Sequence, residues 1–221
     1  MRLSIAGVFD GAALQKLREL LGHGRFVDGR RTAGETARQV KRNLQFDPVG
    51  PEYREAAALV REALSASEVF QVAAWPLLLS PPLFSRYEAG MGYGSHVDNV
   101  LMDCPILRTD LAFTIFLSDP ADYEGGSLVL EEAEGESSVR LEAGALYLYP
   151  ASTIHRVDRV TGGVRDACVG WVQSRLRDPR VREMAFDLAR TRPLLETSGD
   201  EEARLLVAKT LSNLLRMHLE T

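Results

Sequence analysis

Cysteine is scarce in this chain, and its scarcity excludes a fold held together by disulfides. Cys104 and Cys168 are the two that occur, without Cys-x-x-Cys spacing, so neither a disulfide framework nor a paired-thiolate zinc site is expected. A neutral buried thiol is the default for Cys104, with thiolate ligation of a metal as the alternative. Reduced thiols favour the cytoplasm as the compartment.

Long apolar runs and cationic runs are also missing. No stretch approaches the length of a membrane span, and residues 1–11 lack the basic and apolar regions of a signal peptide. The net charge is −5, and Lys and Arg form no continuous stripe. Neither a membrane nor nucleic acid is therefore expected as a partner.

What is present is an ordinary globular composition, with 45% hydrophobic and 26% charged residues in a chain long enough for a sizeable core. The hydrophobic pattern divides the chain into three parts. Residues 1–82 are predicted as a mostly helical support region, residues 83–174 as a core of strands, and residues 175–221 as a second helical region packed on or near that core. The predicted fold class is therefore a mainly β core with flanking helices.

Four helix starts can be predicted from capping residues. Asp10 is expected to cap a helix that ends near Gly22, and Pro51 to open the next helix. In the last part, Asp178-Pro179 predicts one helix start, and the capping-box spacing of Ser198 and Glu201 predicts another. These helical regions are candidate surfaces for a homo-oligomer.

The middle part changes to the periodicity of strands. Residues 110–117 are apolar on both faces, as in a strand covered on both sides. Further predicted strands are 127–131, 138–142, 145–149, 154–160 and 165–173, with residues 75–82 as a loop or edge strand. A turn is expected at Thr161-Gly162-Gly163. Many short strands at this spacing favour a jelly-roll-like double sheet or a barrel.

The chemistry concentrates in His96-Val97-Asp98 and the later His155. In an extended segment, residues i and i+2 point to the same side, so His96 and Asp98 present an imidazole and a carboxylate together. A histidine from another strand completes a set of two imidazoles and one carboxylate. That set leaves coordination positions open and is typical of non-haem Fe(II) oxygenases. A lone His-x-Asp motif is weak evidence for a metal site, and the alternative is that the three residues are ordinary polar side chains on the surface.

Arg165 lies ten residues after His155, beyond the predicted glycine turn. In a hairpin, the two would stand toward opposite ends of neighbouring strands, farther apart than one side chain reaches. A five-carbon diacid fills such a gap, with one end on the metal and the far carboxylate on the guanidinium. The alternative is a surface arginine that pairs with Asp158 or Asp166.

Several longer segments resemble the PKHD-type hydroxylases, a branch of the Fe(II)/2-oxoglutarate oxygenases related to prolyl hydroxylases. The matching segments are FVDGR (26–30), TAG (32–34), KRNLQ (41–45), PPLFSRYEAGMGYGSHVDN (81–99), RTDLAFTIFLSDPADYEGGSLVL (108–130), LYPASTIHRVDRVTGGVR (148–165), WVQSRLRD (171–178) and NLLR (213–216). Ser127 and Met217-His218 depart from the family pattern, outside the predicted metal ligands.

The resemblance implies a double-stranded β-helix that hydroxylates an unidentified small molecule or protein side chain, with conversion of 2-oxoglutarate to succinate and CO2. It implies Fe(II) held by His96, Asp98 and His155 and 2-oxoglutarate held by Arg165. It further implies a Tyr87 hydroxyl that binds the cosubstrate and dependence on L-ascorbate. For Tyr87, a purely structural core tyrosine is the alternative. For the chain, the alternative is a cupin-like metal-binding or sensing module without turnover.

Overall fold

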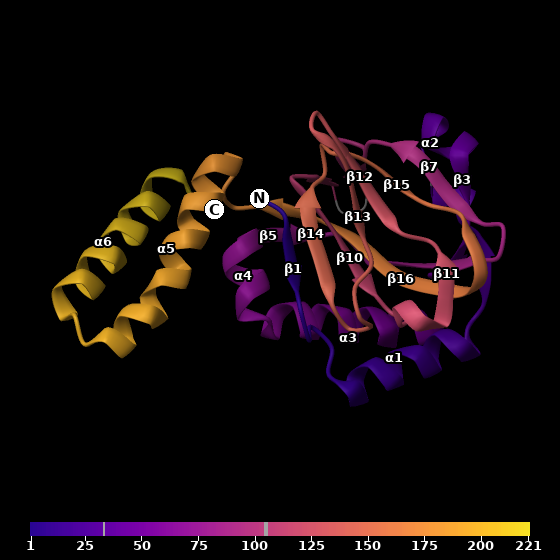
Figure 1. Ribbon diagram of the computed structural model, residues 1–221, viewed down its shortest axis with the longest axis horizontal. Helices are drawn as coiled ribbons and strands as arrows, with labels where there is room; N and C mark the ends of the chain where they lie inside the picture. Colours follow the sequence, from indigo (N-terminus) through magenta and orange to yellow (C-terminus); the bar gives the residue numbers. More distant parts are fainter. Residues whose placement is uncertain (33, 104–105) are drawn as a thin grey trace.

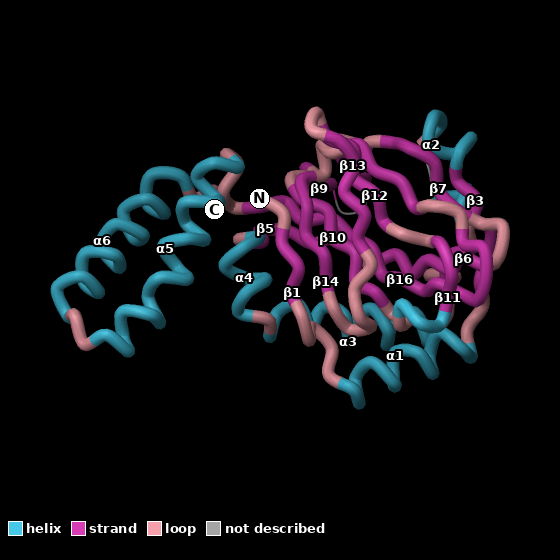
Figure 2. Tube along the Cα trace, viewed as in Figure 1, coloured by secondary structure: helices cyan, strands magenta, loops and turns pink. Residues whose placement is uncertain are grey.

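The computed structural model describes residues 1–32, 34–103 and 106–221, so the expectation for Cys104 lies outside the described residues. Two β-sheets face each other and form one body, and a pair of helices extends away from it (Figures 1 and 2). No helix in the described ranges is long and apolar enough to cross a membrane.

The larger sheet runs in the order β1-β14-β10-β16-β6-β4-β2. Its strands are β1 (Leu3–Ile5), β14 (Leu146–Pro150), β10 (Leu111–Phe116), β16 (Val160–Ser174), β6 (Leu83–Glu88), β4 (Leu44–Phe46) and β2 (Phe26–Asp28), and β5 (Pro76–Leu79) and β11 (Tyr123–Gly125) also pair with β16. Every residue of β10 is buried, because one face meets the helices and the other faces the second sheet. The prediction of a strand covered on both sides is confirmed.

The smaller sheet runs in the order β13-β12-β15-β7-β3. Its strands are β13 (Gly135–Val139), β12 (Leu128–Glu132), β15 (Ile154–Val157), β7 (Gly92–His96) and β3 (Lys41–Arg42), while β8 (Leu101–Asp103) and β9 (Ile106–Arg108) form a separate hairpin. The two facing sheets confirm the double-sheet prediction. Strand β13 lies earlier in the chain than the predicted 138–142.

Helices cover the outer face of the larger sheet. They are α1 (Gly11–His23), α3 (Pro51–Ala66) and α4 (Glu68–Ala74), and their apolar faces form the main hydrophobic core with β10, β14 and β16. The Asp10 side chain caps α1 at the Ala13 amide, 2.8 Å away, and Pro51 opens α3, so both predictions are confirmed. Shorter elements are η1 (Gly29–Thr32), α2 (Glu35–Val40) and η2 (Pro120–Asp122).

Beside its helices, the region 1–82 that was predicted as mostly helical also contains the short strands β1 to β5, which join the sheets. Two sequence expectations were wrong in detail. Residues 154–160 are not one strand, because β15 ends at Val157 and the chain crosses to the other sheet before β16 begins. The expected turn at Gly162-Gly163 lies inside β16, where it pairs with β11 and Gly163 has a φ of +70°.

The C-terminal part is a helical hairpin of α5 (Pro179–Ser198) and α6 (Glu201–His218). Asp178 caps α5 at the Arg180 amide, as predicted. The predicted Ser198 cap is wrong, because α5 continues to Ser198 and Asp200 caps α6 at the Ala203 amide instead. Gly199 takes the left-handed conformation with a φ of +73° and thereby ends α5.

Candidate metal centre

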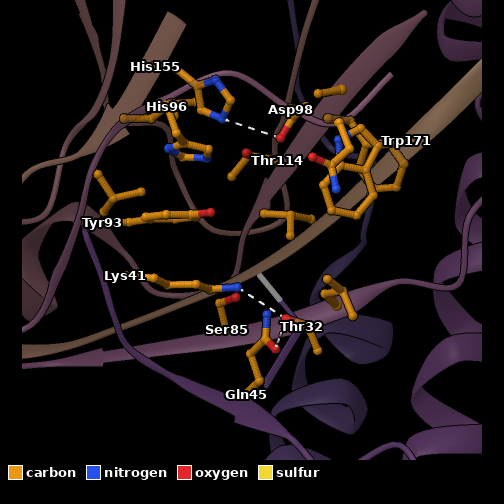
Figure 3. Close-up of a pocket in the computed structure, with 18 of the residues that line it drawn as sticks. Thr32, Lys41, Gln45, Ser85, Tyr93, His96, Asp98, Thr114, His155 and Trp171 are labelled. Carbon is orange, nitrogen blue, oxygen red and sulfur yellow. Dashed lines mark hydrogen bonds and ion pairs between the residues drawn. The ribbon is translucent and has the colours of Figure 1, made fainter. Parts of the chain in front are cut away.

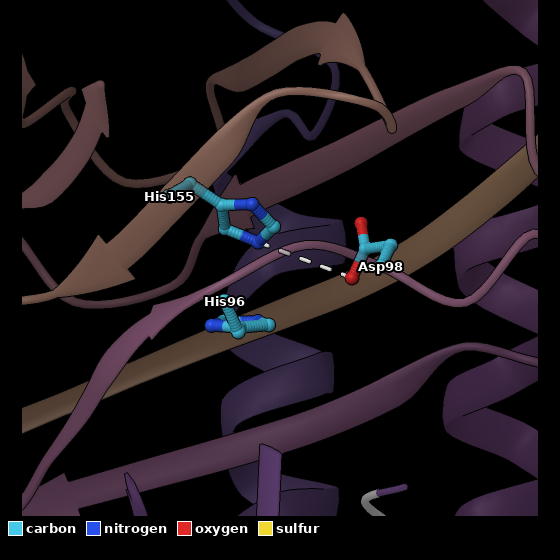
Figure 4. Close-up of side chains that lie close together, drawn as sticks. All are labelled: His96, Asp98 and His155. Carbon is cyan, nitrogen blue, oxygen red and sulfur yellow. Dashed lines mark ion pairs between the residues drawn. The ribbon is translucent and has the colours of Figure 1, made fainter. Parts of the chain in front are cut away.

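Three side chains meet between the two sheets, at the end of β7 and the start of β15. His96 closes β7, Asp98 lies in the loop that follows, and His155 is paired with His96 across the two strands. Their potential ligand atoms lie within 4.8 Å of one another, and His155 Nε2 is 4.0 Å from Asp98 Oδ1 (Figure 4). The structure thus brings together all three residues that the sequence singles out.

Backbone carbonyls orient both imidazoles. His96 Nδ1 lies 2.9 Å from the Gly94 carbonyl oxygen, and His155 Nδ1 lies 3.0 Å from that of Thr153. A carbonyl only accepts, so each Nδ1 carries the proton and donates it. The lone pair is therefore on Nε2 in both rings, which is the arrangement of metal-binding histidines whose second nitrogen is held by an outer partner.

The electrostatics of this cluster favour a cation. Burial and the neighbouring His155 lower the pKa of His96 to about 4, so its imidazole is neutral at neutral pH. Burial raises the pKa of Asp98, and Asp98 Oδ2 is buried without a hydrogen-bond partner among the described residues. Two imidazoles whose Nε2 lone pairs are free and a carboxylate oxygen without a hydrogen-bond partner are a donor set that fits a divalent iron.

Aromatic rings enclose the cluster. Tyr93 stacks on His96 with ring centroids 3.7 Å apart, and the Tyr149 ring meets His155 edge-on at 5.2 Å. Trp171 lies on the Asp98 side, as Figure 3 shows. These rings fix the orientation of the imidazoles and limit the access of water.

Arg165 lies in the same cavity and is almost fully buried, with 1% of its surface exposed. Its guanidinium stands 5.2 Å from the ring centre of Tyr87 and 5.5 Å from that of Phe116. Nε and Nη2 have no hydrogen-bond partner in the part of the chain that the structure describes. Asp158 and Asp166, its alternative partners, pair with Arg156 and Arg86 instead. A guanidinium in this state is prepared to bind an anion.

The expected hairpin between His155 and Arg165 is wrong. Strand β15 pairs with β12 and β7 in the smaller sheet, whereas β16 pairs with β10 and β6 in the larger one. The physical reason is that the chain changes sheets between Val157 and Val160. Both residues line one cavity from opposite walls.

Tyr87 lines the cavity beside Arg165, its partner across β6 and β16. Burial raises the pKa of Tyr87, so its hydroxyl stays protonated and can donate a hydrogen bond. Tyr149 on β14, opposite Ala112 of β10, also lines the cavity, and burial raises its pKa well above the usual range. Sequence reasoning missed Tyr149, although strand alternation places Tyr147 and Tyr149 opposite the core residues Leu146 and Leu148.

Comparison with known proteins agrees with this geometry. The family model of the 2OG-Fe(II) oxygenase superfamily matches residues 82–173. A PKHD-type hydroxylase of Synechococcus sp. (strain JA-2-3B'a(2-13)) is 46% identical over 223 residues, which cover 100% of both chains. Another from Synechococcus elongatus is 47% identical over 219 residues, 98% of both chains.

Solved structures share the fold at low sequence identity. A Pseudomonas putida prolyl-4-hydroxylase superposes with a TM-score of 0.55 at 18% identity, over 79% of this chain and 92% of its own. HygX from Streptomyces hygroscopicus, solved with nickel and 2-oxoglutarate bound, gives 0.55 at 16% identity, over 79% and 84%. The sheets and helices described above are thus those of a double-stranded β-helix.

Proposed function

Since the chain belongs to the PKHD-type hydroxylases of the 2OG-Fe(II) oxygenase superfamily, we propose that His96, Asp98 and His155 hold its iron and that Arg165 holds its 2-oxoglutarate. The observation that carries the assignment is the convergence of three ligand atoms, two imidazole nitrogens and one carboxylate oxygen, within 4.8 Å of one another.

When bound, ferrous iron and 2-oxoglutarate together supply the chemistry: one oxygen atom of O2 enters a C–H bond of the substrate, while 2-oxoglutarate loses CO2 and becomes succinate with the other. The residues of the chain prepare that chemistry. The Nδ1 donors fix the two imidazoles, Tyr93 and Tyr149 pack against them, and Asp98 provides the anionic ligand. The enclosed site keeps water away from the reacting atoms.

Arg165 suits the distal carboxylate of 2-oxoglutarate. A guanidinium presents parallel N–H donors that match a carboxylate, and its burial among apolar rings strengthens the interaction. The protonated hydroxyls of Tyr87 and Tyr149 are further donors on the same wall of the cavity. HygX was solved with 2-oxoglutarate and nickel bound, which supports a shared mode of binding.

Residues 83–174 form the catalytic core, and the flanking regions support it. L-Ascorbate sustains turnover by keeping iron reduced, which the family resemblance supports. The cytoplasm is the compartment, in keeping with a free buried Cys168. Exposed apolar side chains on α5 and α6, such as Leu194 and Leu206, are the candidate surface for a homo-oligomer.

The test measures succinate from 2-oxoglutarate with Fe(II), ascorbate and O2, together with a gain of one oxygen in the mass spectrum of a cell extract. The wild-type protein should form succinate, and His96→Ala should abolish it. Arg165→Ala should weaken 2-oxoglutarate binding by about tenfold or more, the worth of a lost charge-assisted hydrogen bond.

Arg86→Ala is the matched control for Arg165→Ala, since Arg86 is an arginine on the neighbouring strand that pairs with Asp166. It should leave 2-oxoglutarate binding unchanged. Metal binding without any succinate from the wild-type protein would instead favour the non-catalytic, cupin-like module. Full turnover by His96→Ala would show that the ligand assignment is wrong.

A further inference from the structure

A second group of hydrogen-bond donors lines the same cavity, apart from Arg165 and the three proposed ligands. Lys41 comes from β3, Gln45 from β4 and Thr32 from the end of η1. Figure 3 shows the Lys41 ammonium ending beside Ser85 and Thr32, with the Gln45 amide below it. Lys41 is 5% exposed and Gln45 is 4% exposed, so their polar atoms need a partner inside the protein or in a ligand.

The direction of the hydrogen bonds in this group is fixed by Lys41, whose ammonium can only donate. Lys41 Nζ has donors alone, so Thr32 Oγ1 accepts from it at 3.2 Å. The Thr32 hydroxyl then donates a hydrogen bond to Gln45 Oε1, which at 2.5 Å is nearer than the Gly29 carbonyl oxygen at 3.2 Å. Gln45 Nε2 is left buried and unsatisfied within the described residues. The group therefore presents unused N–H donors from Lys41 and Gln45 to the cavity.

Lys41 also has no direct ion-pair partner. Among the described residues no carboxylate lies within 4.0 Å of Nζ, and Asp98 and Asp28 act on it only from farther away. Burial lowers the pKa of Lys41 to about 8, so the cation still predominates at neutral pH. A buried cation without a counter-ion is unfavourable, and a bound anion would relieve that cost.

The cavity thus has more cationic side chains than the cosubstrate can satisfy. Of the two carboxylates of 2-oxoglutarate, the proposed function places one at the metal and the other at Arg165. We propose that Lys41, with Gln45 and Thr32, binds a carboxylate of the substrate, so that this hydroxylase acts on a small organic acid. This inference rests on the proposed function. The depth of Lys41 favours a free small acid over an acidic side chain of a folded protein.

The first experiment measures binding without turnover. The protein is loaded with Mn(II) and saturating 2-oxoglutarate without O2, and trifluoroacetate is titrated while its fluorine NMR relaxation is followed. The paramagnetic ion reports probe bound inside the same cavity. Trifluoroacetate should bind and neutral trifluoroacetamide should not. Lys41→Met should lower the affinity for trifluoroacetate by about tenfold or more, and Lys41→Arg should retain most of that affinity.

Two further variants separate a binding role from a structural one. Gln45→Glu places an internal counter-ion beside Lys41 and should abolish probe binding while it raises the melting temperature. Arg42→Met is the matched control, because Arg42 is the next residue of β3 and is exposed; it should bind the probe like the wild type. Lys41→Met should melt no lower than the wild type, since it removes an unpaired buried charge.

The proposal is overturned if Lys41→Met binds trifluoroacetate as tightly as the wild type does. It is also overturned if Lys41→Met lowers the affinity for 2-oxoglutarate as much as Arg165→Ala does. Failure of the proposed function appears separately, as absence of Mn(II) or 2-oxoglutarate loading before any probe is added. In a turnover screen, the acidic small-molecule fraction of a cell extract should stimulate succinate formation. Stimulation confined to neutral or cationic fractions, or to acidic peptides, contradicts the assignment.

Discussion

At the scale of single residues, the position of Arg165 depends on a glycine. Gly126 has a φ of +64°, and a Cβ placed there would lie 2.9 Å from Arg165 Cδ and 2.9 Å from Val160 Cγ2. The absence of a side chain at residue 126 therefore leaves room for the methylene groups of Arg165. Its guanidinium then remains among aromatic rings with unsatisfied donors.

Gly126→Ala should weaken 2-oxoglutarate binding by about tenfold, because the displaced guanidinium loses charge-assisted hydrogen bonds. Calorimetric titration with Mn(II) and no O2 measures the change. Gly7→Ala is the control: Gly7 has nearly the same φ, +62°, and nothing within 4 Å of the added Cβ. Both variants should lose some stability through left-handed strain, but an equal loss of 2-oxoglutarate affinity would disprove the contact with Arg165.

Cys168 gives a second prediction at this scale. It is fully buried in the main core, and burial raises the pKa of its thiol, so thiolate is scarce and inaccessible at neutral pH. Iodoacetamide at pH about 8 should leave Cys168 unmodified in the folded protein and modify it in urea. Peptide mapping distinguishes the two states, and rapid modification without urea would contradict the buried position.

The sequence was most informative where a short spacing could be combined with the family resemblance. His96 and Asp98 are two residues apart, which in extended backbone places both side chains on one side, and the resemblance supplied His155 as the third ligand. Lys41 and Gln45 could not be assigned in that way. They lie on strands of two and three residues, too short for an alternating pattern, and their burial results from pairing with β7 and β6.

At the scale of elements, helices were more predictable than strands. A capping aspartate and a following periodic face are local signals, which is why α1, α3 and α5 begin where expected. Which sheet a strand joins is a tertiary property. The change of sheets between β15 and β16 leaves no local signal, since the whole segment 154–160 has strand character.

The cap of α5 should make stability depend on pH. Hydrogen bonds from the Arg180 side chain and amide lower the pKa of Asp178 to about 2. A lowered folded-state pKa stabilises the fold above the ordinary value of 3.8, and that contribution is lost as pH falls toward 2. The stability advantage of the wild type over Asp178→Ala should therefore shrink below pH about 4.

Chemical unfolding at several pH values measures this advantage. Asp178→Asn is the control, because the amide oxygen keeps the cap but does not titrate in this range. The difference in the free energy of unfolding between Asp178→Asn and Asp178→Ala should vary less with pH than the difference between the wild type and Asp178→Ala. An advantage of the wild type that stays constant down to the lowest pH at which the protein folds would argue against the ionised cap.

At the scale of the whole molecule, the chain has two separate regions of packing. The main core joins the larger sheet to α1, α3 and α4 and also includes Phe186 from the first half of α5, whereas the rest of α5 and α6 packs in a smaller cluster around Leu176, Ala185 and Leu211. The hairpin is tied to the body at its base, where Leu176 pairs with Leu219 and Glu220 meets Arg108. Its far end extends away from the sheets (Figure 1).

Native-state hydrogen exchange should reflect this arrangement. Amides near the tip of the hairpin, at residues 194–204, should exchange far sooner than those of β10 and β16, because the tip has few buried contacts and Pro193 interrupts the hydrogen bonds of α5. Mass spectrometry of peptides after timed labelling gives the comparison. Exchange of the tip together with the central strands would instead indicate a single cooperative unit.

The small core of the hairpin has a consequence for how sequence change is tolerated. Among the described residues, those that line the cavity end at Trp171, before the hairpin begins. Substitutions that destabilise the α5–α6 hairpin should therefore leave the cavity and its candidate metal ligands in place. Sequence changes that accumulate in α5 and α6 would then affect proteolysis and self-association of the protein before they affected catalytic turnover.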